Sequence, residues 1–527
     1  MSDSWATFGA DLHLDLGARG GGPGREGDSD GAGGRAAYGT RTALMDAVRD
    51  AIRTGRLTPG TRLPSSRSLA ADLGLARNTV AGAYAELVAE GWLAAQQGSG
   101  TRVAHRAEPA PPRGPGLRPH THPQLPGQAR WKQRPAHDLR TGAPDVSAFP
   151  RSAWLTSARR ALTTAPARAF AHGDHRGTTE LRRALADYLA RARGVRADPE
   201  RIVICAGFSQ GLALLARVLG GDVAVEEYGL SFHRDLLEAP GVRTHPLPLD
   251  GHGARTTCLE ATGPEATGPD ATDPDVSDGT VPAAAAHLAD VRAVLLTPGH
   301  QYPTGVPLHP DRRAAVVTWA SRTGGLVLED DYDGEFRYDR QPVGALQGLD
   351  PDRVVYLGTS SKALAPALRL AWMVLPDHLV DALLAAKTPA EWTTGALDQL
   401  TLADFLERGA YDRHVRAMRT RYRERRDRLV STLAARAPGV RATGIAAGLH
   451  AVLELPPGAE EAAVLSAARR RGVALDALSD FRHPQAPPLP VPRPALVVGY
   501  GAPAEHAYPA ALEALCGALA DGGAGAG

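Results

Sequence analysis

The sequence predicts an α/β protein built from two folded parts of unequal size. Residues 37–104 form a short, regularly patterned segment of amphipathic helices followed by two short strands. Residues 105–137 are rich in Pro, Arg and His, a composition that cannot bury a core and is typical of a semi-rigid linker. Over residues 138–527, apolar strands alternate with amphipathic helices, which predicts a large domain with a mostly parallel sheet.

Two further segments are expected to lie outside the folded parts. Residues 1–36 are rich in Gly, Asp and Arg and predict a disordered tail. Residues 251–282 contain three imperfect five-residue repeats, at 261–275, and predict a low-complexity insertion that forms a surface loop. The N-terminus has no basic start followed by an apolar run, and no segment is apolar enough for a membrane helix. We therefore expect a cytoplasmic protein.

The charge and cysteine content narrow the classes of partner. Three separated cysteines (Cys205, Cys258 and Cys516), without a CxxC or Cys/His cluster, predict reduced structural thiols and no metal site. The chain has a formal net charge of +1, but residues 35–106 hold ten arginines against five acids. Such a basic segment favours nucleic-acid binding, although scattered charge is also typical of a solvated face.

Lysine is rare in this chain, which makes each lysine a candidate for amine chemistry. Of 59 basic residues only three are lysines, Lys132, Lys362 and Lys387. A composition that favours arginine so strongly keeps a lysine where an amine is needed, because arginine effectively never deprotonates.

The first two helices of the small N-terminal part are predicted from periodicity and capping residues. Residues 41–54 place apolar side chains on one helical face. After a turn, Ser65 or Ser66 can cap a second helix, SRSLAADLG, which Gly74 ends.

A third helix and a wing follow. Asn78 or Thr79 is expected to start the helix, and two short strands surround residues 98–100. This order of elements is typical of DNA-binding domains whose third helix enters the major groove. Periodicity alone equally allows a small three-helix protein-interaction domain.

Individual residues favour DNA binding. The string GRLTPGTRLPSSRSLAADLGLARNTVAGAYAELVAEGWLAAQQGSGTRV closely resembles the winged helix-turn-helix of the GntR family over its whole length. The resemblance implies that Arg67 of the second helix and Arg77 at the start of the third contact DNA. It also implies DNA contacts from the helix starts and the wing, at Ser65, Asn78, Thr79, Gly98 and Gly100.

Two segments of the large domain carry residues suited to a cofactor. VVYLGTSSKALAPALRLAWMVLP places Lys362 between two strands, with Thr359, Ser361 and Arg369 spaced around it. A lysine amine can form the Schiff base of pyridoxal phosphate, and hydroxyl groups with an arginine suit its phosphate. GGLVLEDDYDGEFRY is a strand that ends in acids, and a carboxylate there can pair with the pyridine nitrogen. By itself this acidic run also fits a solvated turn or a metal site.

Two more segments complete a set of four. LLTPGHQYPTGVPL follows another strand, and RIVICAGFSQGLALLARVL is a strand, a glycine turn and a helix whose N-terminus suits an anion. Together and in this order, the four segments resemble the pyridoxal-phosphate domain of fold type I aminotransferases, in the form found in the MocR subfamily of GntR-type regulators. The resemblance covers residues 38–515.

The resemblance implies a role for each candidate residue. Lys362 takes the catalytic position of the Schiff-base lysine, Asp330 pairs with the pyridine nitrogen and Tyr332 contacts the ring hydroxyl. The implied phosphate ligands are Arg369, Thr359, Ser361, Ser209 and Gln210. The subfamily also implies a head-to-tail homodimer that binds double-stranded operator DNA.

This sequence departs from the family pattern at three positions. His172 replaces a tyrosine in the segment HGDHRGTTELRRALADYL. Leu230 stands where an aromatic residue usually stacks on the cofactor ring, and Phe232 can substitute. Val497 stands where aminotransferases have the arginine that holds the substrate carboxylate, and valine cannot form that bidentate contact. A conventional amino-acid substrate is therefore disfavoured.

The sequence thus predicts a pyridoxal-phosphate-dependent transcription regulator of the MocR type, whose aminotransferase-like domain senses a ligand. The missing arginine favours pyridoxal phosphate itself as the effector, as in PdxR-like members that control vitamin B6 metabolism. Two alternatives stay open. One is a regulator that senses an amino compound through its cofactor adduct, as GabR-like members do. The other is an active aminotransferase with a tethered DNA-binding domain.

Overall fold

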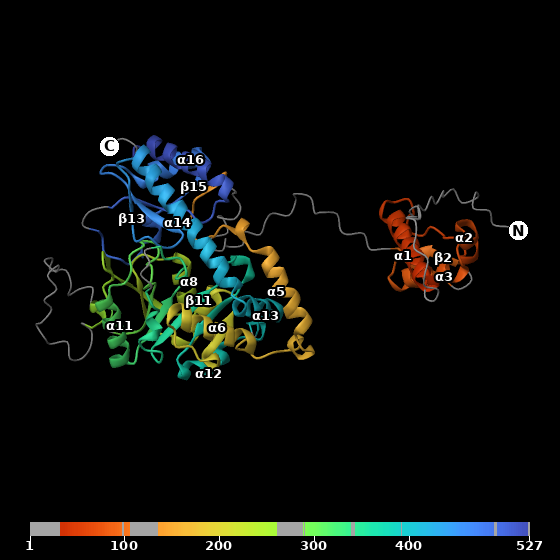
Figure 1. Ribbon diagram of the computed structural model, residues 1–527, viewed down its shortest axis with the longest axis horizontal. Helices are drawn as coiled ribbons and strands as arrows, with labels where there is room; N and C mark the ends of the chain where they lie inside the picture. The colour runs from red at the N-terminus through yellow and green to blue at the C-terminus, as the bar shows by residue number, and fades with distance from the viewer. Residues whose placement is uncertain are drawn as a thin grey trace, which may run out of the picture. The chain divides into compact units, whose positions relative to one another are not determined.

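The chain divides into two compact units, residues 1–123 and 124–527, in the computed structural model of Figure 1. In the described part of the chain, no helix is long and apolar enough to cross a membrane. The structure describes residues 32–96, 100–105, 135–260, 288, 290–338, 343–391, 393–489 and 493–524.

The first unit consists of three helices and a two-stranded sheet. Its elements are α1 (Ala32–Arg53), α2 (Ser66–Leu73), α3 (Arg77–Ala89), β1 (Leu93–Gln96) and β2 (Gly100–Val103). The two strands pair antiparallel, as the wing requires. One apolar core joins the helices and the wing, and it includes Leu44, Val48, Leu69, Val80, Leu87 and Val103.

The predicted helix boundaries of this unit are confirmed for α2. The Ser65 hydroxyl accepts a hydrogen bond from the Ser68 amide at 3.1 Å, which satisfies one of the free donors at the helix start. Gly74 ends the helix in the left-handed conformation, at φ 65°. The third helix begins at Arg77, one residue before the predicted start.

Two predicted boundaries are wrong. Helix α1 begins at Ala32, inside the predicted tail of residues 1–36, because the sequence from there to the predicted helix has no proline to stop it. Part of the predicted insertion 251–282 is also folded, since Ala254 and Leu259 are buried in an apolar core. Gly98 and residues 106–134 and 261–287 lie outside the described residues.

A seven-stranded sheet forms the centre of the second unit. Its strand order is β4-β12-β11-β10-β9-β5-β6, and every pairing is parallel except those of β12 with its two neighbours. The mostly parallel sheet confirms the predicted α/β class. The strands are β4 (Ile202–Cys205), β5 (Asp222–Glu226), β6 (Arg243–Leu247), β9 (Val291–Leu296), β10 (Leu326–Asp330), β11 (Val354–Thr359) and β12 (Ala371–Val374).

Helices cover both faces of this sheet, so alternate strand residues enter different cores. Val203 and Cys205 pack on one face with α7 (Phe208–Leu219), α8 (Ser231–Glu238) and α12 (Asp377–Ala386). Ile202 and Ile204 pack on the other face with α6 (Thr179–Arg193) and α13 (Ala396–Glu407). Helix α5 (Arg151–Thr164) lies beside α13. This double burial explains why the strands read as almost continuous apolar runs. Helix α11 (Pro310–Thr323) and the short α9 (Thr257–Glu260) cover the part of that second face formed by β5, β9, β10 and the start of β11.

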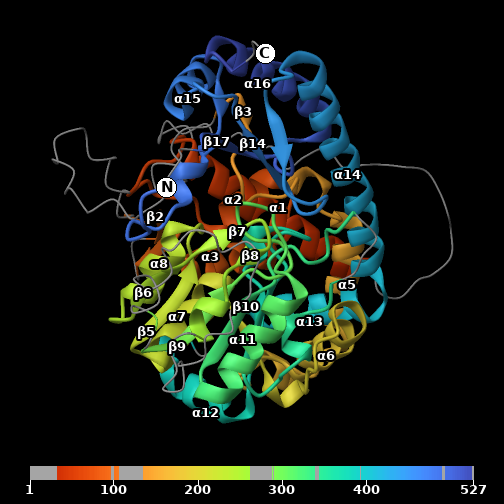
Figure 2. The same cartoon turned by 90° about the vertical axis from the view of Figure 1, so that its left-hand side faces the viewer.

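A smaller four-stranded antiparallel sheet follows, in the order β13-β14-β17-β16. Helix α14 (Ala410–Arg436) runs between this sheet and the region of α13, as Figure 2 shows. The strands are β13 (Arg441–Thr443), β14 (His450–Glu454), β16 (Asp476–Ala477) and β17 (Ala495–Gly499), and the other helices are α15 (Glu461–Arg470) and α16 (Tyr508–Asp521). Two short pairs complete the unit, β3 (His137–Asp138) with β15 (Val473–Ala474), and β7 (Leu249–Asp250) with β8 (Gly253–Ala254).

Candidate functional site

The loops after the strands of the large sheet surround a cavity of about 810 Å³. Ligands bind at this edge in open α/β sheets, because the loops after parallel strands meet there. Of the eight predicted cofactor residues, Gln210 does not belong to the described lining of the cavity, and its side chain instead accepts a hydrogen bond from the Ala206 amide at 2.6 Å. The other seven all line it, namely Lys362, Asp330, Tyr332, Thr359, Ser361, Arg369 and Ser209.

Lys362 lies in the loop after β11, with its amine at the cavity. The amine donates a hydrogen bond to the backbone carbonyl of Gly142. Burial lowers the pKa of Lys362, while the nearby carboxylates of Asp330 and Asp333 oppose the shift. A lowered pKa leaves more of the amine neutral, which is the form that attacks a carbonyl group.

Asp330 ends β10 and has a buried oxygen without a partner. Its Oδ1 forms no hydrogen bond within the described structure, although the residue is only 5% exposed. Burial raises the pKa of Asp330 well above its usual value, and the Lys362 charge opposes that shift. An unsatisfied buried acceptor is costly, so a donor from a ligand is expected there. The protonated nitrogen of a pyridine ring fits this requirement.

Thr359, Ser361 and Arg369 form a cradle suited to an anion. The Thr359 hydroxyl donates to Ser361 Oγ at 2.8 Å and accepts from the Ser361 amide at 3.1 Å. Arg369 adopts a left-handed conformation at φ 53° and donates to the carbonyl of Ala206. Gly207 adopts φ 91°, which favours glycine, and a Cβ atom there would lie 2.6 Å from the Arg369 guanidinium carbon and displace it.

The start of α7 completes the cradle. Ser209 lies in its first turn, and no side chain caps that helix end. A helix N-terminus attracts anions through its free amide groups and its dipole. The hydroxyl groups, the guanidinium and the helix end together fit a phosphate group.

A buried polar network surrounds Tyr332, and sequence reasoning missed it. The Tyr332 hydroxyl lies 3.0 Å from His300 Nδ1, which also lies 2.9 Å from Asp333 Oδ2. On the same side of the cavity, the hydroxyl groups of Thr141 and Tyr302 form a hydrogen bond. His300 and Tyr302 belong to LLTPGHQYPTGVPL, so the sequence identifies the segment but not the roles of these side chains.

The predicted DNA-binding residues lie at the starts of α2 and α3 and in the wing. Arg67, Arg77 and Asn78 are exposed, and Thr79 is half-buried. Neither arginine forms an ion pair within the described residues, so both guanidinium groups are available to an anionic partner. Gly100 is exposed at the start of β2, with φ 88°.

Comparison with known families and proteins identifies both units. The family "Bacterial regulatory proteins, gntR family" matches residues 40–103, and "Aminotransferase class I and II" matches residues 138–486. The "HTH-type pyridoxine biosynthesis transcriptional regulator PdxR" of Corynebacterium glutamicum is 33% identical over 84% of this chain and 88% of its own length. The "Probable rhizopine catabolism regulatory protein MocR" of Rhizobium meliloti is 32% identical over 72% of this chain and 74% of its own.

This chain belongs to the MocR subfamily of GntR-type transcription regulators. Among solved structures, the kynurenine aminotransferase of Pyrococcus horikoshii is similar to the second unit of this MocR-type chain. It is 25% identical, with a TM-score of 0.63, over 74% of the chain and 92% of that structure. The first unit is therefore a winged helix-turn-helix, and the second has the aminotransferase fold.

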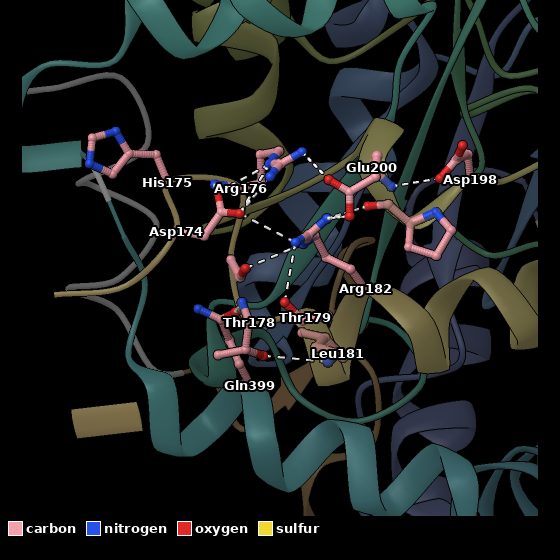
Figure 3. A network of polar contacts seen from close by, with 12 residues as sticks. Asp174, His175, Arg176, Thr178, Thr179, Leu181, Arg182, Asp198, Glu200 and Gln399 are labelled. Atoms are coloured by element: carbon pink, nitrogen blue, oxygen red, sulfur yellow. Dashed lines mark hydrogen bonds and ion pairs between the residues drawn. The ribbon is translucent and has the colours of Figure 1, made fainter. Parts of the chain in front are cut away.

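The segment HGDHRGTTELRR of this MocR-type chain has a structural role. Within the described residues, His172 forms no hydrogen bond or ion pair with the rest of the segment. Arg182 is almost fully buried and pairs with Asp174 at 3.3 Å and Glu200 at 3.0 Å, as Figure 3 shows. Thr178 caps α6 by accepting from the Leu181 amide. His172 itself is exposed. The motif therefore anchors α6 through its acidic and basic residues.

The other two departures from the family pattern leave the cavity with apolar walls. Leu230 and Phe232 both line the cavity, and His233 lies between the rings of Phe232 and Phe208. Val497 in β17 is fully buried in an apolar cluster with Tyr302, Tyr332, Phe481 and Leu230. At this position of β17 the side chain is therefore apolar and cannot bind a carboxylate.

Proposed function

We propose that this chain regulates transcription by changing its affinity for operator DNA when pyridoxal phosphate binds in the cavity. The unpartnered Asp330 oxygen, opposite an amine and beside an anion cradle, carries the proposal. The apolar Val497 supports sensing of the cofactor over turnover of an amino acid. The name of the C. glutamicum relative supports target genes of vitamin B6 metabolism.

The predicted residues that line the cavity would contact different parts of the cofactor. Pyridoxal phosphate supplies an aldehyde that reacts with amines and a ring that withdraws electrons. Lys362 would hold it covalently, Asp330 would accept a hydrogen bond from its ring nitrogen, and Tyr332 would donate to its ring hydroxyl. Gln210 would act indirectly, by fixing the turn that precedes α7. The phosphate would be held by Thr359, Ser361, Arg369 and Ser209.

The winged helix-turn-helix would read the DNA. We assign base or phosphate contacts to Arg67 and Arg77, whose exposed guanidinium groups stand at the starts of two helices. Further contacts would come from the same helix starts and the wing, at Ser65, Asn78, Thr79, Gly98 and Gly100. Two copies of the chain would form a head-to-tail homodimer and thus present two such domains to repeated half-sites.

A binding experiment tests the proposal directly. DNA fragments retained by the protein are first sequenced, with and without pyridoxal phosphate, to define the operator. The operator is then titrated with cofactor-free and cofactor-loaded protein at one salt concentration, since phosphate contacts make DNA affinity salt-dependent. A ligand shifts an equilibrium only by its difference in affinity between two states, so the two curves must differ. Identical curves and identical footprints would contradict the proposal.

A further inference from the structure

The cationic side chains that line the cavity have partners or proposed roles, with one exception. Lys362, Asp330 and Arg369 face the proposed cofactor. Arg140 is neutralised by Asp138, through contacts of 2.9 Å to Oδ1 and 2.6 Å to Oδ2.

Glu226, another lining residue, is held by neutral donors. It accepts hydrogen bonds from the Thr297 hydroxyl at 2.5 Å and from the Gln301 amide at 3.2 Å. Burial raises its pKa to about 7. Of the cationic lining residues in the described structure, Arg234 alone has neither a counter-ion nor a proposed role.

Arg234 is a buried cation on α8. It is 9% exposed and lines the cavity, and its Nη1 donates to the carbonyl of Gly229 at 3.2 Å. Its side chain forms no ion pair within the described residues. The carboxylates of Asp235 and Glu238 act on it only from a distance, and burial lowers its pKa. A guanidinium carries five N–H donors, and burying one without an anion is costly.

No carboxylate of the described residues lies within ion-pair distance of Arg234, and the cavity leaves room for a ligand beside it. The neighbouring His233 is kept neutral, because burial lowers its pKa to about 3. Leu230, Phe232 and Tyr228 give this part of the lining apolar contact surface. A cavity of 810 Å³ lies in the upper part of the ~300–1,000 Å³ range that holds drug-sized ligands, and pyridoxal phosphate is smaller than such ligands.

We propose that Arg234 forms a second anion subsite in the cavity, which binds the carboxylate of a small organic acid beside the cofactor. The guanidinium would hold the carboxylate through two parallel hydrogen bonds, and the apolar lining would contact its short carbon chain. This subsite rests on the proposed function, because it assumes that the cofactor occupies the Lys362 side. Through this subsite an effector's carboxylate could still bind in the cavity, although Val497 stands where aminotransferases have the carboxylate-binding arginine.

Three compounds of one carbon skeleton test the subsite by calorimetry on the cofactor-loaded protein. Succinate, succinamate and succinamide carry two, one and no carboxylates. We expect the first two to bind at millimolar or lower concentration, and succinamide to bind at least about tenfold more weakly. Arg234→Gln should lose at least about tenfold in affinity for both anions, whereas Arg234→Lys should keep part of it. Arg243→Gln, which removes an exposed arginine outside the cavity, is the matched control and should bind like the unmodified chain.

Two results would overturn the subsite. One is equal binding of the three compounds to the unmodified chain, or an affinity of the two anions for Arg234→Gln that equals their affinity for the unmodified chain, with a melting curve showing that the variant is folded. The other is loss of pyridoxal phosphate from Arg234→Gln, which would make Arg234 a ligand of the cofactor phosphate. If the unmodified chain fails to attach pyridoxal phosphate, the proposed function is contradicted instead. The same titration on the cofactor-free chain then still decides whether Arg234 binds carboxylates.

Discussion

The amine of Lys362 donates a hydrogen bond to the backbone carbonyl of Gly142, a residue 220 positions earlier in the chain. This contact fixes the amine at the cavity, where burial lowers its pKa. Gly142 follows β3, so the short segment at the start of the second unit helps to orient the lysine.

Lys362→Ala should abolish covalent attachment of pyridoxal phosphate. Added cofactor should give the unmodified chain the visible absorption band of a lysine-bound pyridoxal phosphate, and borohydride should fix it to the peptide that contains Lys362. Because the amine must be neutral to react and its pKa is lowered, the attachment rate should be half-maximal below the pKa of an ordinary lysine. Lys387→Arg changes a buried lysine outside the cavity lining and should attach the cofactor normally. A borohydride-reducible adduct in Lys362→Ala would refute the assignment.

The sequence predicts the strands and turns that carry the site, because their apolar runs and glycines are local signals. It also places Lys362, Asp330 and Arg369 in one site, since the order of segments is specific to a family. The sequence does not show that one carboxylate oxygen of Asp330 has no hydrogen-bond partner, or that Arg234 has no carboxylate partner within the described residues. Those facts depend on packing between segments far apart in the chain, and no local pattern encodes it.

The ends of the helices likewise differ in whether the local sequence predicts them. The end of α2 follows from Gly74, whereas the early start of α1 at Ala32 lies in a glycine-rich segment whose composition predicts a disordered tail. Residues 253–260 fall inside the predicted insertion 251–282, yet they are folded. Their folding depends on the contacts of Ala254 and Leu259 with distant strands.

The double variant Arg67→Ala with Arg77→Ala should lose operator binding and keep cofactor binding. Loss of a base-reading arginine costs about 1–3 kcal/mol at that base, and loss of a phosphate contact weakens binding on all sequences. Gel-shift titrations at several salt concentrations distinguish the two kinds of contact. A charge-matched control, Arg243→Ala with Arg441→Ala, removes two exposed arginines of the second unit. Equal affinity of the first variant and this control would refute the DNA-binding role.

Glu335→Gln should stabilise the protein above neutral pH. Glu335 is half-buried and accepts hydrogen bonds from Tyr411 at 3.0 Å and Tyr188 at 3.3 Å, and desolvation raises its pKa to about 7. Between the pKa of an unfolded glutamate and this value, the folded state holds a proton that the unfolded state has lost. Stability therefore falls as the pH rises through that window. At about 1.4 kcal/mol per pKa unit, the total loss of stability is roughly 3 kcal/mol.

Thermal melts of Glu335→Gln at pH 5 and pH 8 test this linkage. We expect the gain in melting temperature over the unmodified chain to be larger at pH 8, because the amide has no proton to lose. Glu424→Gln changes an exposed glutamate and should show no such pH dependence. A gain of equal size at both pH values would mean that the carboxyl group of Glu335 does not titrate in this range.

Leu155→Asp with Leu162→Asp should dissociate the proposed homodimer. The two leucines are 59% and 55% exposed and lie seven residues apart on α5, so they share one face of the helix. Exposed apolar side chains that gather on one face mark an interaction surface. Sedimentation should show a dimer for the unmodified chain and for Leu349→Asp, which changes a leucine with 58% exposure outside α5. A dimer mass for the double aspartate variant would exclude this face as the interface.

The cofactor-loaded protein should convert amino acids slowly or not at all. Turnover requires the carboxylate to be held so that the reacting C–H bond stands perpendicular to the cofactor ring, and orientation of this kind can contribute several kcal/mol to catalysis. The place of the orienting arginine is taken by Val497, which is fully buried among Tyr302, Tyr332 and Phe481. We expect alanine and glutamate to change the cofactor spectrum at or below about 0.1 s⁻¹, some 100-fold under the ~10 s⁻¹ of a typical enzyme. Stopped-flow absorbance measures this rate, and the kynurenine aminotransferase of the same fold serves as the positive control. A rate near 10 s⁻¹, together with equal operator affinity in the presence and absence of the cofactor, would identify the chain as an active aminotransferase.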